Sequence, residues 1–173
     1  MPERFVIFSH GKDSEPWGRK LSGLADIART EGYRADSLDY RGIDSPRDRI
    51  TKLVDYCQKL PGELVLVGSS LGGYVATAAA SLLHARGLFL LAPALMVEGL
   101  EPLRDGVIDC PTTIIHGWRD AVVPVEHSIR FAERYRAALH VLDTDHRMYD
   151  SLQTINYYFE HFLVDVDLRL GYR

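Results

Sequence analysis

The sequence predicts an α/β fold, in which a doubly wound parallel sheet of about six strands is covered by helices on both faces, giving three layers. Short apolar runs typical of buried parallel strands alternate with longer segments in which apolar residues recur at helical spacing. No repeat, low-complexity tract or linker interrupts this alternation. The length of 173 residues suits a single domain over residues 1–173 with a full hydrophobic core.

The chain begins with an apolar run over residues 4–9, which predicts a buried strand, followed by a polar loop over residues 9–14. Residues 17–29 carry leucine and alanine at helical spacing, and Gly32 ends the predicted helix. Residues 34–40 predict a weaker strand. We expect it near a sheet edge because two aspartates interrupt it.

The next helix is expected to begin with Ser45 as its N-cap and Pro46 in its first turn, and a Pro-Gly pair after residue 60 ends it. Residues 64–67 then predict a third strand, which is apolar throughout. The helix expected over residues 74–83 is rich in small side chains, so it can lie close to the sheet.

The second half of the chain predicts three more strands, over residues 87–92, 111–116 and 138–143. Residues 93–106 form a connection that could hold one short helix. Pro124 begins a helix that runs to about residue 137. The final helix is expected over residues 151–163, where apolar residues recur at helical spacing.

Strands that alternate with helices in this way are joined by right-handed crossovers. We expect the doubly wound strand order 2-1-3-4-5-6. This order places the loops after the first and third strands side by side, where the direction of winding reverses. Ligands bind at such a switch point, so the loops at residues 9–14 and 69–73 are predicted to form the site.

The second of these loops contains the pentapeptide Gly68-Ser69-Ser70-Leu71-Gly72, a G-x-S-x-G pattern between a strand and a helix. A strand that reverses directly into a helix holds the central serine in strained backbone angles, with its hydroxyl clear of the sheet. Glycine is needed at 68 and 72 because a Cβ at either position would collide with a neighbouring element. The pattern predicts Ser70 as a nucleophile.

A serine nucleophile needs a base, usually a histidine, and a carboxylate that orients the base. Both should lie in loops after later strands, and the order serine, acid, histidine is expected for this arrangement. Of the seven histidines, His146 has the best position, after the last strand. His116 ends a strand and is interpreted as a packed, hydrogen-bonded histidine. Asp120 is the predicted acid, with Asp143 and Asp145 as alternatives that could be turn residues.

The negative oxygen that forms during acyl transfer must be met by fixed hydrogen-bond donors. The backbone N–H of Leu71, directly after the nucleophile, is one predicted donor. The second is expected from the loop after the first strand, where Gly11 permits close backbone approach and either Lys12 or His10 could present its N–H. The sequence leaves the choice between these two residues open.

Composition excludes several other classes of function. The net charge of −4 gives no basic surface for nucleic acid, and no apolar run approaches the length that spans a membrane. The first residues lack the apolar core of a signal peptide, so a cytoplasmic location is expected. Cys57 and Cys110 match no metal spacing and are expected to be reduced core thiols. No phosphate-binding glycine motif is present, so neither a cofactor nor a metal is expected.

Several motifs together resemble the small, lidless α/β-hydrolases, in particular the dienelactone-hydrolase-like and retinoblastoma-binding-protein-like serine hydrolases. The matching segments are Phe8-Ser9-His10-Gly11, Gly68-Ser69-Ser70-Leu71-Gly72, His116-Gly117-Trp118-Arg119-Asp120 with Val123-Pro124, and Asp145-His146. The resemblance covers residues 4–163. It implies Ser70 as nucleophile, Asp120 as acid, His146 as base, and an acyl-enzyme formed from esters, thioesters or amides.

The chain departs from the larger family in two ways. We expect a minimal version of the fold, without the two further strands with which most members begin, and the segment after the fourth strand is too short for a cap domain. A missing cap implies an open acyl site, which Leu95, Met96, Trp118 and Met148 could line. Dienelactone hydrolases usually carry cysteine as nucleophile, so Ser70 disfavours that reaction.

The expected function is a serine hydrolase that acts on small-molecule esters or thioesters with small or medium acyl groups. Two alternatives stay open. The same acyl-enzyme could serve an acyltransferase or perhydrolase, or the fold could have become a binding protein without catalysis. The sequence does not define the oligomeric state.

Overall fold

A computed structural model describes residues 2–104, 106 and 108–172. Six parallel strands form one sheet in the order β2-β1-β3-β4-β5-β6, which confirms the predicted order. β2 lies at one edge, as predicted, and β6 lies at the other. The strands are β1 (Glu3–Ser9), β2 (Arg34–Leu38), β3 (Gly62–Ser69), β4 (Gly87–Leu91), β5 (Thr112–Gly117) and β6 (Ala138–Leu142).

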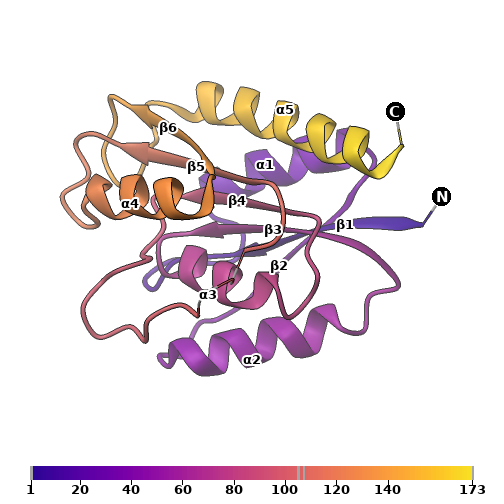
Figure 1. Cartoon of the computed structure of the whole chain (residues 1–173), viewed down its shortest axis with the longest axis horizontal. Coiled ribbons are helices and arrows are strands. Elements are labelled where there is room, and N and C mark those ends of the chain that lie inside the picture. Colours follow the sequence, from indigo (N-terminus) through magenta and orange to yellow (C-terminus); the bar gives the residue numbers. More distant parts are fainter. Residues whose placement is uncertain (1, 105, 107, 173) are drawn as a thin grey trace.

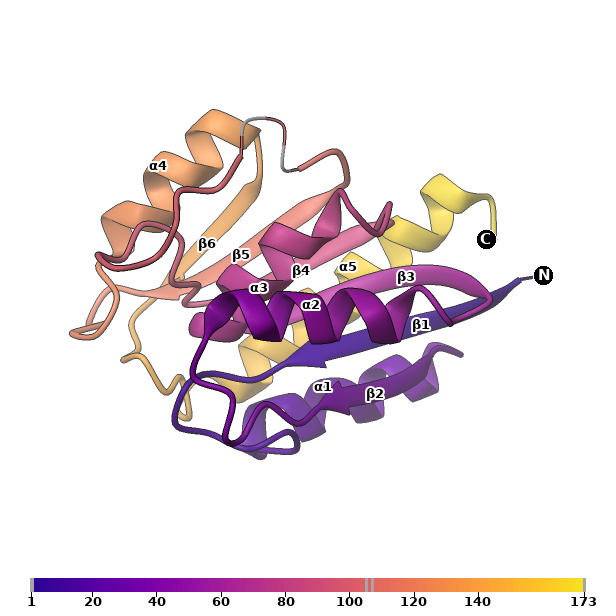
Figure 2. The same ribbon diagram turned by 90° about the horizontal axis from the view of Figure 1, so that it is seen from below.

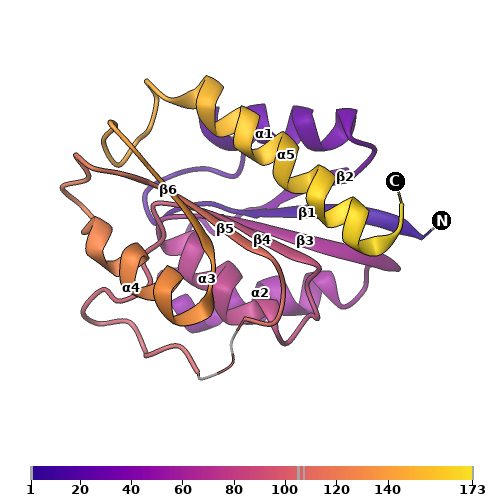
Figure 3. The same cartoon turned by 45° about the horizontal axis from the view of Figure 1, so that its top comes forward.

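Helices cover both faces of the sheet, which confirms the three-layer prediction (Figure 1 and Figure 3). One face carries α1 (Arg19–Thr30) and α5 (Leu152–Leu170). The other carries α2 (Pro46–Cys57), α3 (Leu71–Ala80) and α4 (Val125–Tyr135). Figure 2 looks onto this second face, where α3 lies between α2 and α4.

The core consists of two apolar clusters, one on each face of the sheet. Successive strand side chains point to opposite faces, so Phe5 and Ile7 pack toward α2 and α3 whereas Val6 and Phe8 pack toward α1 and α5. β3 and β4 alternate in the same way. Both faces are covered, which explains why the strands read as continuous apolar runs in the sequence.

The segment between β4 and β5 differs from the expectation. No residue of this connection that the structure describes is helical, so the suggested short helix is wrong. Pro93 and Pro102 each lack a backbone N–H, and Gly99 has a φ of +87°. Within the described residues, no cap domain is inserted after β4.

The last helix is longer than predicted, because α5 continues from residue 163 to Leu170. Val166 and Asp167 in the additional turns are 1% exposed. The Asp167 carboxylate accepts hydrogen bonds from Arg4 (2.6 Å) and from the Tyr33 hydroxyl (2.6 Å). Asp167, near the end of the helix, is therefore part of a buried contact with β1.

The two ends of the described chain lie close together, on the side of the molecule away from the carboxyl ends of the strands (right in Figure 1). The Arg4 guanidinium lies 5.6 Å from the centre of the Tyr172 ring. Among the residues that the structure describes, no helix has both the length and the apolar character needed to cross a membrane.

Candidate active site

Ser70 lies in the tight turn that joins β3 to α3, with φ of 54° and ψ of −120°. These angles are strained for a residue with a side chain. The Ser70 N–H donates to the Leu91 carbonyl (3.0 Å), and the Ala94 N–H donates to the Ser70 carbonyl (3.0 Å). The next strand and its loop therefore stabilise the turn.

The glycines of this turn are required by space, as the sequence predicted. A Cβ at Gly68 would lie 2.4 Å from the Gly72 carbonyl oxygen. A Cβ at Gly72 would lie 2.0 Å from the carbonyl oxygen of Ser9 in β1. Both contacts are with backbone, which cannot move aside as a side chain can, so β1 and α3 can approach this closely only around glycine.

His146 lies in the loop after β6, and its Nε2 is 3.1 Å from the Ser70 hydroxyl oxygen. Asp145 shapes this loop, because its carboxylate accepts the backbone N–H groups of Arg147 (2.9 Å) and Met148 (3.0 Å). Met148 is fully buried and has a φ of 59°. The loop is thus closed by its own hydrogen bonds and by the buried side chain of Met148, two residues after the histidine.

Asp120 lies in the loop after β5, and its Oδ2 is 2.7 Å from Nδ1 of His146. Its other oxygen accepts the backbone N–H groups of Val122 (2.9 Å) and Val123 (2.8 Å). The two alternative candidates for the acid have other partners. Asp143 pairs with Arg119 at the surface, and the Asp145 carboxylate accepts a backbone N–H of its own turn. Ser70, His146 and Asp120 therefore form one continuous hydrogen-bonded chain.

The Asp120 side chain is completely buried, yet it stays acidic. Burial alone raises the pKa of a carboxyl group. Here the backbone N–H of Val123, the ring of His146 and the backbone N–H of Val122 outweigh that effect and lower the pKa of Asp120 below its usual range. The carboxylate is therefore ionised at neutral pH and can hold the His146 ring with its Nδ1 protonated.

His116 is a further contact of Asp120 that the sequence analysis missed. Its Nε2 lies 3.1 Å from Asp120 Oδ2 and 3.0 Å from the Val123 carbonyl oxygen. Nε2 faces two acceptors and so carries the proton, and Nδ1 then accepts from the Ser128 hydroxyl at 2.7 Å. Burial lowers the pKa of His116, which favours this neutral form. Its spacing of four residues from Asp120 was the only signal in the sequence.

The loop after β1 lies beside the nucleophile. A Cβ built on Gly11 would be 3.5 Å from the Ser70 Cβ. The His10 ring is turned away to other partners: Nδ1 contacts the Gly11 carbonyl oxygen (2.8 Å), and Nε2 accepts from the Tyr40 N–H (2.9 Å). Within the part of the chain that the structure describes, the N–H groups of Leu71 and Lys12 donate to no other protein atom.

Lys20 on α1 is another charged group near the site that no sequence motif indicated. Burial lowers the pKa of Lys20 to about 8, although attraction to Asp120 and Asp145 opposes this effect. The ammonium group therefore adds a positive charge on the side of the site formed by the acid and base loops.

The four residues suggested as acyl lining have different environments. Leu95 and Met148 are buried within the two core clusters. Met96 and Trp118 are 43% and 61% exposed, on the loops after β4 and β5. Only the latter two have free surface to offer a substrate, so the lining stays a prediction for them and is disfavoured for Leu95 and Met148.

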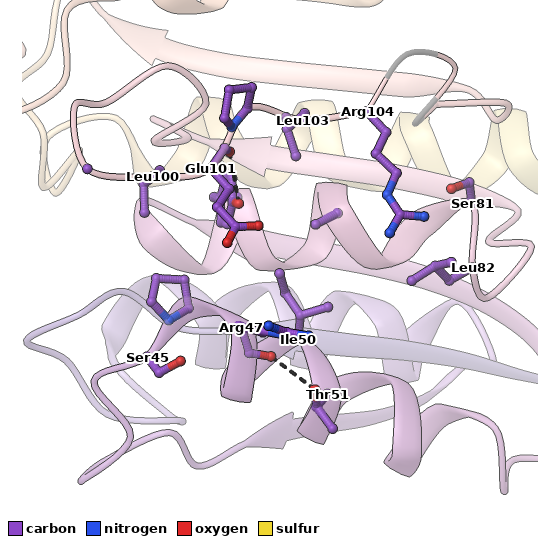
Figure 4. Close-up of a pocket in the computed structure, with 15 residues that line it drawn as sticks. Ser45, Arg47, Ile50, Thr51, Ser81, Leu82, Leu100, Glu101, Leu103 and Arg104 are labelled. Atoms are coloured by element: carbon purple, nitrogen blue, oxygen red, sulfur yellow. Dashed lines mark hydrogen bonds between the residues drawn. The ribbon is translucent and has the colours of Figure 1, made fainter.

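A cavity of about 700 Å³ lies away from the hydrogen-bonded chain, between α2, α3 and the connection after β4 (Figure 4). Arg47, Ile50 and Thr51 lie on its α2 side, and Leu100 and Arg104 lie on the connection opposite (Figure 4). Its lining includes none of Ser70, Asp120 and His146. A second cavity of about 400 Å³ lies between the same connection and α4. Both cavities flank this connection, whose described residues form no helix.

Solved structures with the same fold cover almost the whole chain. A protein assigned to the alpha/beta hydrolase superfamily from Xanthomonas campestris pv. campestris is 28% identical with a TM-score of 0.86, over 94% of this chain and 99% of that one. Est1E from Butyrivibrio proteoclasticus, solved with bound ferulic acid, is 19% identical with a TM-score of 0.78, over 94% and 88%. The esterase Pf2001 from Pyrococcus furiosus is 18% identical with a TM-score of 0.80, over 95% and 83%.

The last two similarities are similarities of fold alone, because their sequence identity is low. No curated protein matches the chain. The sequence model of the alpha/beta hydrolase family matches residues 6–167, which is nearly the whole sequence. Together with the sheet order and the turn at Ser70, this match identifies the chain as a member of the alpha/beta hydrolase family.

Proposed function

We propose that this protein is a serine hydrolase that cleaves esters or thioesters of small or medium acyl groups through an acyl-enzyme on Ser70. The observation that carries the proposal is the continuous chain from the Ser70 hydroxyl to His146 (3.1 Å) and from His146 to Asp120 (2.7 Å). In such a chain the base is within reach of the nucleophile, and the acid fixes the tautomer of the base.

In the proposed acylation, the Ser70 oxygen attacks the acyl carbon while its proton passes to Nε2 of His146. Asp120 stabilises the imidazolium that forms, through the proton on Nδ1. The tetrahedral intermediate then collapses, the bond to the leaving oxygen or sulfur breaks, and His146 gives its proton to the departing alcohol or thiol. The free N–H groups of Leu71 and Lys12 are the proposed donors to the negative oxygen.

Deacylation repeats these steps with water. Water attacks the acyl carbon and gives a proton to His146. The Ser70 oxygen then leaves and takes that proton back, so the enzyme returns to its starting state and the carboxylic acid departs. If another nucleophile outcompetes water at this step, the same acyl-enzyme performs acyl transfer or peracid formation. A comparison of product ratios in water, alcohol and hydrogen peroxide separates these activities.

The first prediction concerns the nucleophile. Wild-type protein should react with a fluorophosphonate probe, and Ser70→Ala should not, because only an activated serine attacks phosphorus at a useful rate. Ser69→Ala is the matched control: this neighbouring serine is 7% exposed and belongs to β3, so its variant should still be labelled. Labelling is read by intact-protein mass spectrometry.

Failure of a well-folded wild-type protein to be labelled would favour the non-catalytic binding protein. Labelling of Ser70→Ala would mean that another residue is the nucleophile. If labelling is specific, hydrolysis of p-nitrophenyl acetate, butyrate and octanoate then measures the acyl preference. Methyl ferulate belongs in the same series because Est1E binds ferulic acid.

A further inference from the structure

Arg49 on α2 is a buried cation with an unusual set of partners. It is only 2% exposed and is among the largest side chains that are fully buried. Its Nε donates to the Ile43 carbonyl (2.7 Å), one Nη donates to the Gly11 carbonyl (3.3 Å), and its guanidinium lies 5.3 Å from the centre of the Tyr40 ring. No carboxylate of the described residues forms a salt bridge with it.

Burial lowers the pKa of Arg49, and attraction to Asp44 and Asp13 opposes that effect without forming a salt bridge. Burial of a charge that no salt bridge compensates is costly. Carbonyl oxygens recover part of that cost, and a neutral side chain would avoid it altogether. The position of the charge therefore needs an explanation. One of its two carbonyl partners belongs to Gly11, in the loop that lies beside Ser70.

The Gly11 carbonyl oxygen is held by two donors. The Tyr40 N–H donates to Nε2 of His10, so the proton of the neutral ring is on Nδ1, which donates to Gly11 at 2.8 Å. Arg49 is the second donor. The Ser14 hydroxyl lies farther off, at 3.5 Å. The His10 donor is the shorter of the two, at 2.8 Å against 3.3 Å for Arg49. Arg49 lies on α2, and the His10 ring is held by Tyr40 in the segment after β2.

This arrangement fixes the peptide group between Gly11 and Lys12. The described chain contains no cis peptide bond, and in a trans peptide the N–H points opposite to the C=O. When the Gly11 oxygen is turned toward Arg49, the Lys12 N–H is turned away from Arg49. That N–H has no other acceptor among the described residues. A Cβ built on Gly11 would lie 3.5 Å from the Ser70 Cβ, so this part of the loop is close to the nucleophile.

We propose that Arg49 is a positioning residue for the oxyanion site: it holds the Gly11–Lys12 peptide so that the Lys12 N–H faces the acyl oxygen bound to Ser70. The inference rests on the proposed serine hydrolase function. Lys12, rather than His10, is then the second oxyanion donor. The positive charge behind the peptide also polarises it in the direction that favours a negative oxygen in front of the N–H.

The proposal predicts a specific kinetic effect. Complete loss of an oxyanion donor costs on the order of 10²–10³ in rate. Arg49→Met keeps the Lys12 N–H but no longer holds the Gly11–Lys12 peptide in one orientation. The kcat for p-nitrophenyl butyrate should therefore fall by about 10- to 100-fold, with KM changed little. The affinity for n-butylboronic acid should fall by a similar factor, because its adduct with Ser70 places a negative oxygen at the same point.

The matched control is Arg47→Met, which removes an exposed arginine from the same helix and should keep wild-type kcat and boronate affinity. Arg49→Lys retains the charge but can reach one carbonyl at a time, so its kcat should lie between those of wild type and Arg49→Met. Circular dichroism and thermal melting establish that each variant is folded. A purely structural role for Arg49 would lower the melting temperature without this loss of boronate affinity.

The outcomes are distinguishable. If wild-type protein neither reacts with fluorophosphonate nor hydrolyses any ester, the proposed function fails. If wild type is active and folded Arg49→Met keeps kcat and boronate affinity within about twofold, the role of Arg49 is overturned. Should Arg49→Met not fold, NMR of the wild-type protein decides: phosphonylation of Ser70 should move the Lys12 amide proton downfield, and an unmoved Lys12 resonance would overturn the assignment.

Discussion

At the scale of single residues, the surroundings of Asp120 determine what the hydrogen-bonded chain can do. Its two oxygens are each met by two nitrogen groups: the backbone N–H groups of Val122 and Val123 on one side, and the rings of His116 and His146 on the other. Four donors around one buried carboxylate keep it charged and leave it no freedom to rotate. The orientation of His146 follows from that rigidity.

Replacement of the acid tests this reading. Asp120→Asn should lower kcat by about 10⁴, because an amide can stabilise the wrong tautomer of His146 and cannot balance an imidazolium. Asp143→Asn is the control, since Asp143 is exposed and pairs with Arg119 at the surface. Ester hydrolysis under saturating substrate measures the effect. If Asp120→Asn is active and Asp143→Asn or Asp145→Asn is inactive, the acid is Asp143 or Asp145 and not Asp120.

Removal of His116, the second histidine in contact with Asp120, should lower the free energy of unfolding. His116→Ala leaves the Ser128 hydroxyl and one Asp120 oxygen short of a buried partner, and an unsatisfied buried group costs about 1–3 kcal/mol. His161→Ala, on the exposed side of α5, should change the free energy of unfolding little. Urea denaturation compares the two variants. Equal stabilities would mean that His116 is not needed to satisfy Asp120.

At the scale of elements, the acid and base loops meet because β5 and β6 are parallel neighbours. The Trp118 N–H donates to the Leu142 carbonyl and the Arg119 N–H donates to the Thr144 carbonyl, which continues the strand pairing into the loops. A Cβ at Gly117 would lie 2.2 Å from the Thr144 carbonyl oxygen. The close approach of the two loops therefore depends on a glycine at the end of β5.

The turn between β3 and α3 has the same requirement. Gly72→Ala would place a Cβ 2.0 Å from the Ser9 carbonyl oxygen and should destabilise the fold by about 3 kcal/mol while it displaces Ser70. At Gly18 the nearest atom to a built Cβ is 3.8 Å away, so Gly18→Ala is the matched control and should be nearly neutral. Thermal melting together with fluorophosphonate labelling reads both effects. Wild-type behaviour of Gly72→Ala would contradict the packing described for this turn.

Sequence patterns predicted the elements best where one physical requirement dominates. The apolar run of β3, the turn glycines and the Ser45 cap, whose side chain accepts the Asp48 N–H at 3.2 Å, were all predictable from local chemistry. The length of α5 was not, because Asp167 interrupts the apolar pattern and its partner Arg4 is 163 residues away. Between β4 and β5, the described residues form no helix, and two prolines without an N–H and a positive φ at Gly99 disfavour one there.

For the site, parallel strands bring their carboxyl ends to one edge, so the sequence order alone predicted which loops carry Ser70, Asp120 and His146. The contact of Arg49 with Gly11 could not be predicted. It joins residues 38 positions apart, and a lone arginine in an amphipathic helix normally faces solvent.

At the scale of the whole molecule, buried histidines make stability depend on pH. Burial lowers the pKa values of His10, His116 and His140 below the usual value near 6.5. The unfolded chain therefore binds more protons than the native protein between those lowered pKa values and about 6.5. The free energy of unfolding should rise with pH through this range and fall as the solution is acidified below about pH 6.5.

Urea denaturation at pH 7.5, 6.5 and 5.5 measures this dependence. The protein with both His10→Gln and His116→Gln is less stable overall, but its stability should change less between pH 6.5 and 5.5 than that of wild type. An identical slope for the two proteins would assign the pH dependence to other groups.

The contact between Arg4 and Tyr172 brings the two ends of the described chain close enough to test whether the fold depends on the order of its elements along the chain. A short linker could join the two ends, and new ends could be opened at the exposed segment near residue 98. Such a circular permutant would carry Asp120 and His146 in its first part and Ser70 in its last. If it still reacts with fluorophosphonate, the site depends on which strands pair in the sheet and not on the order of the strands along the chain.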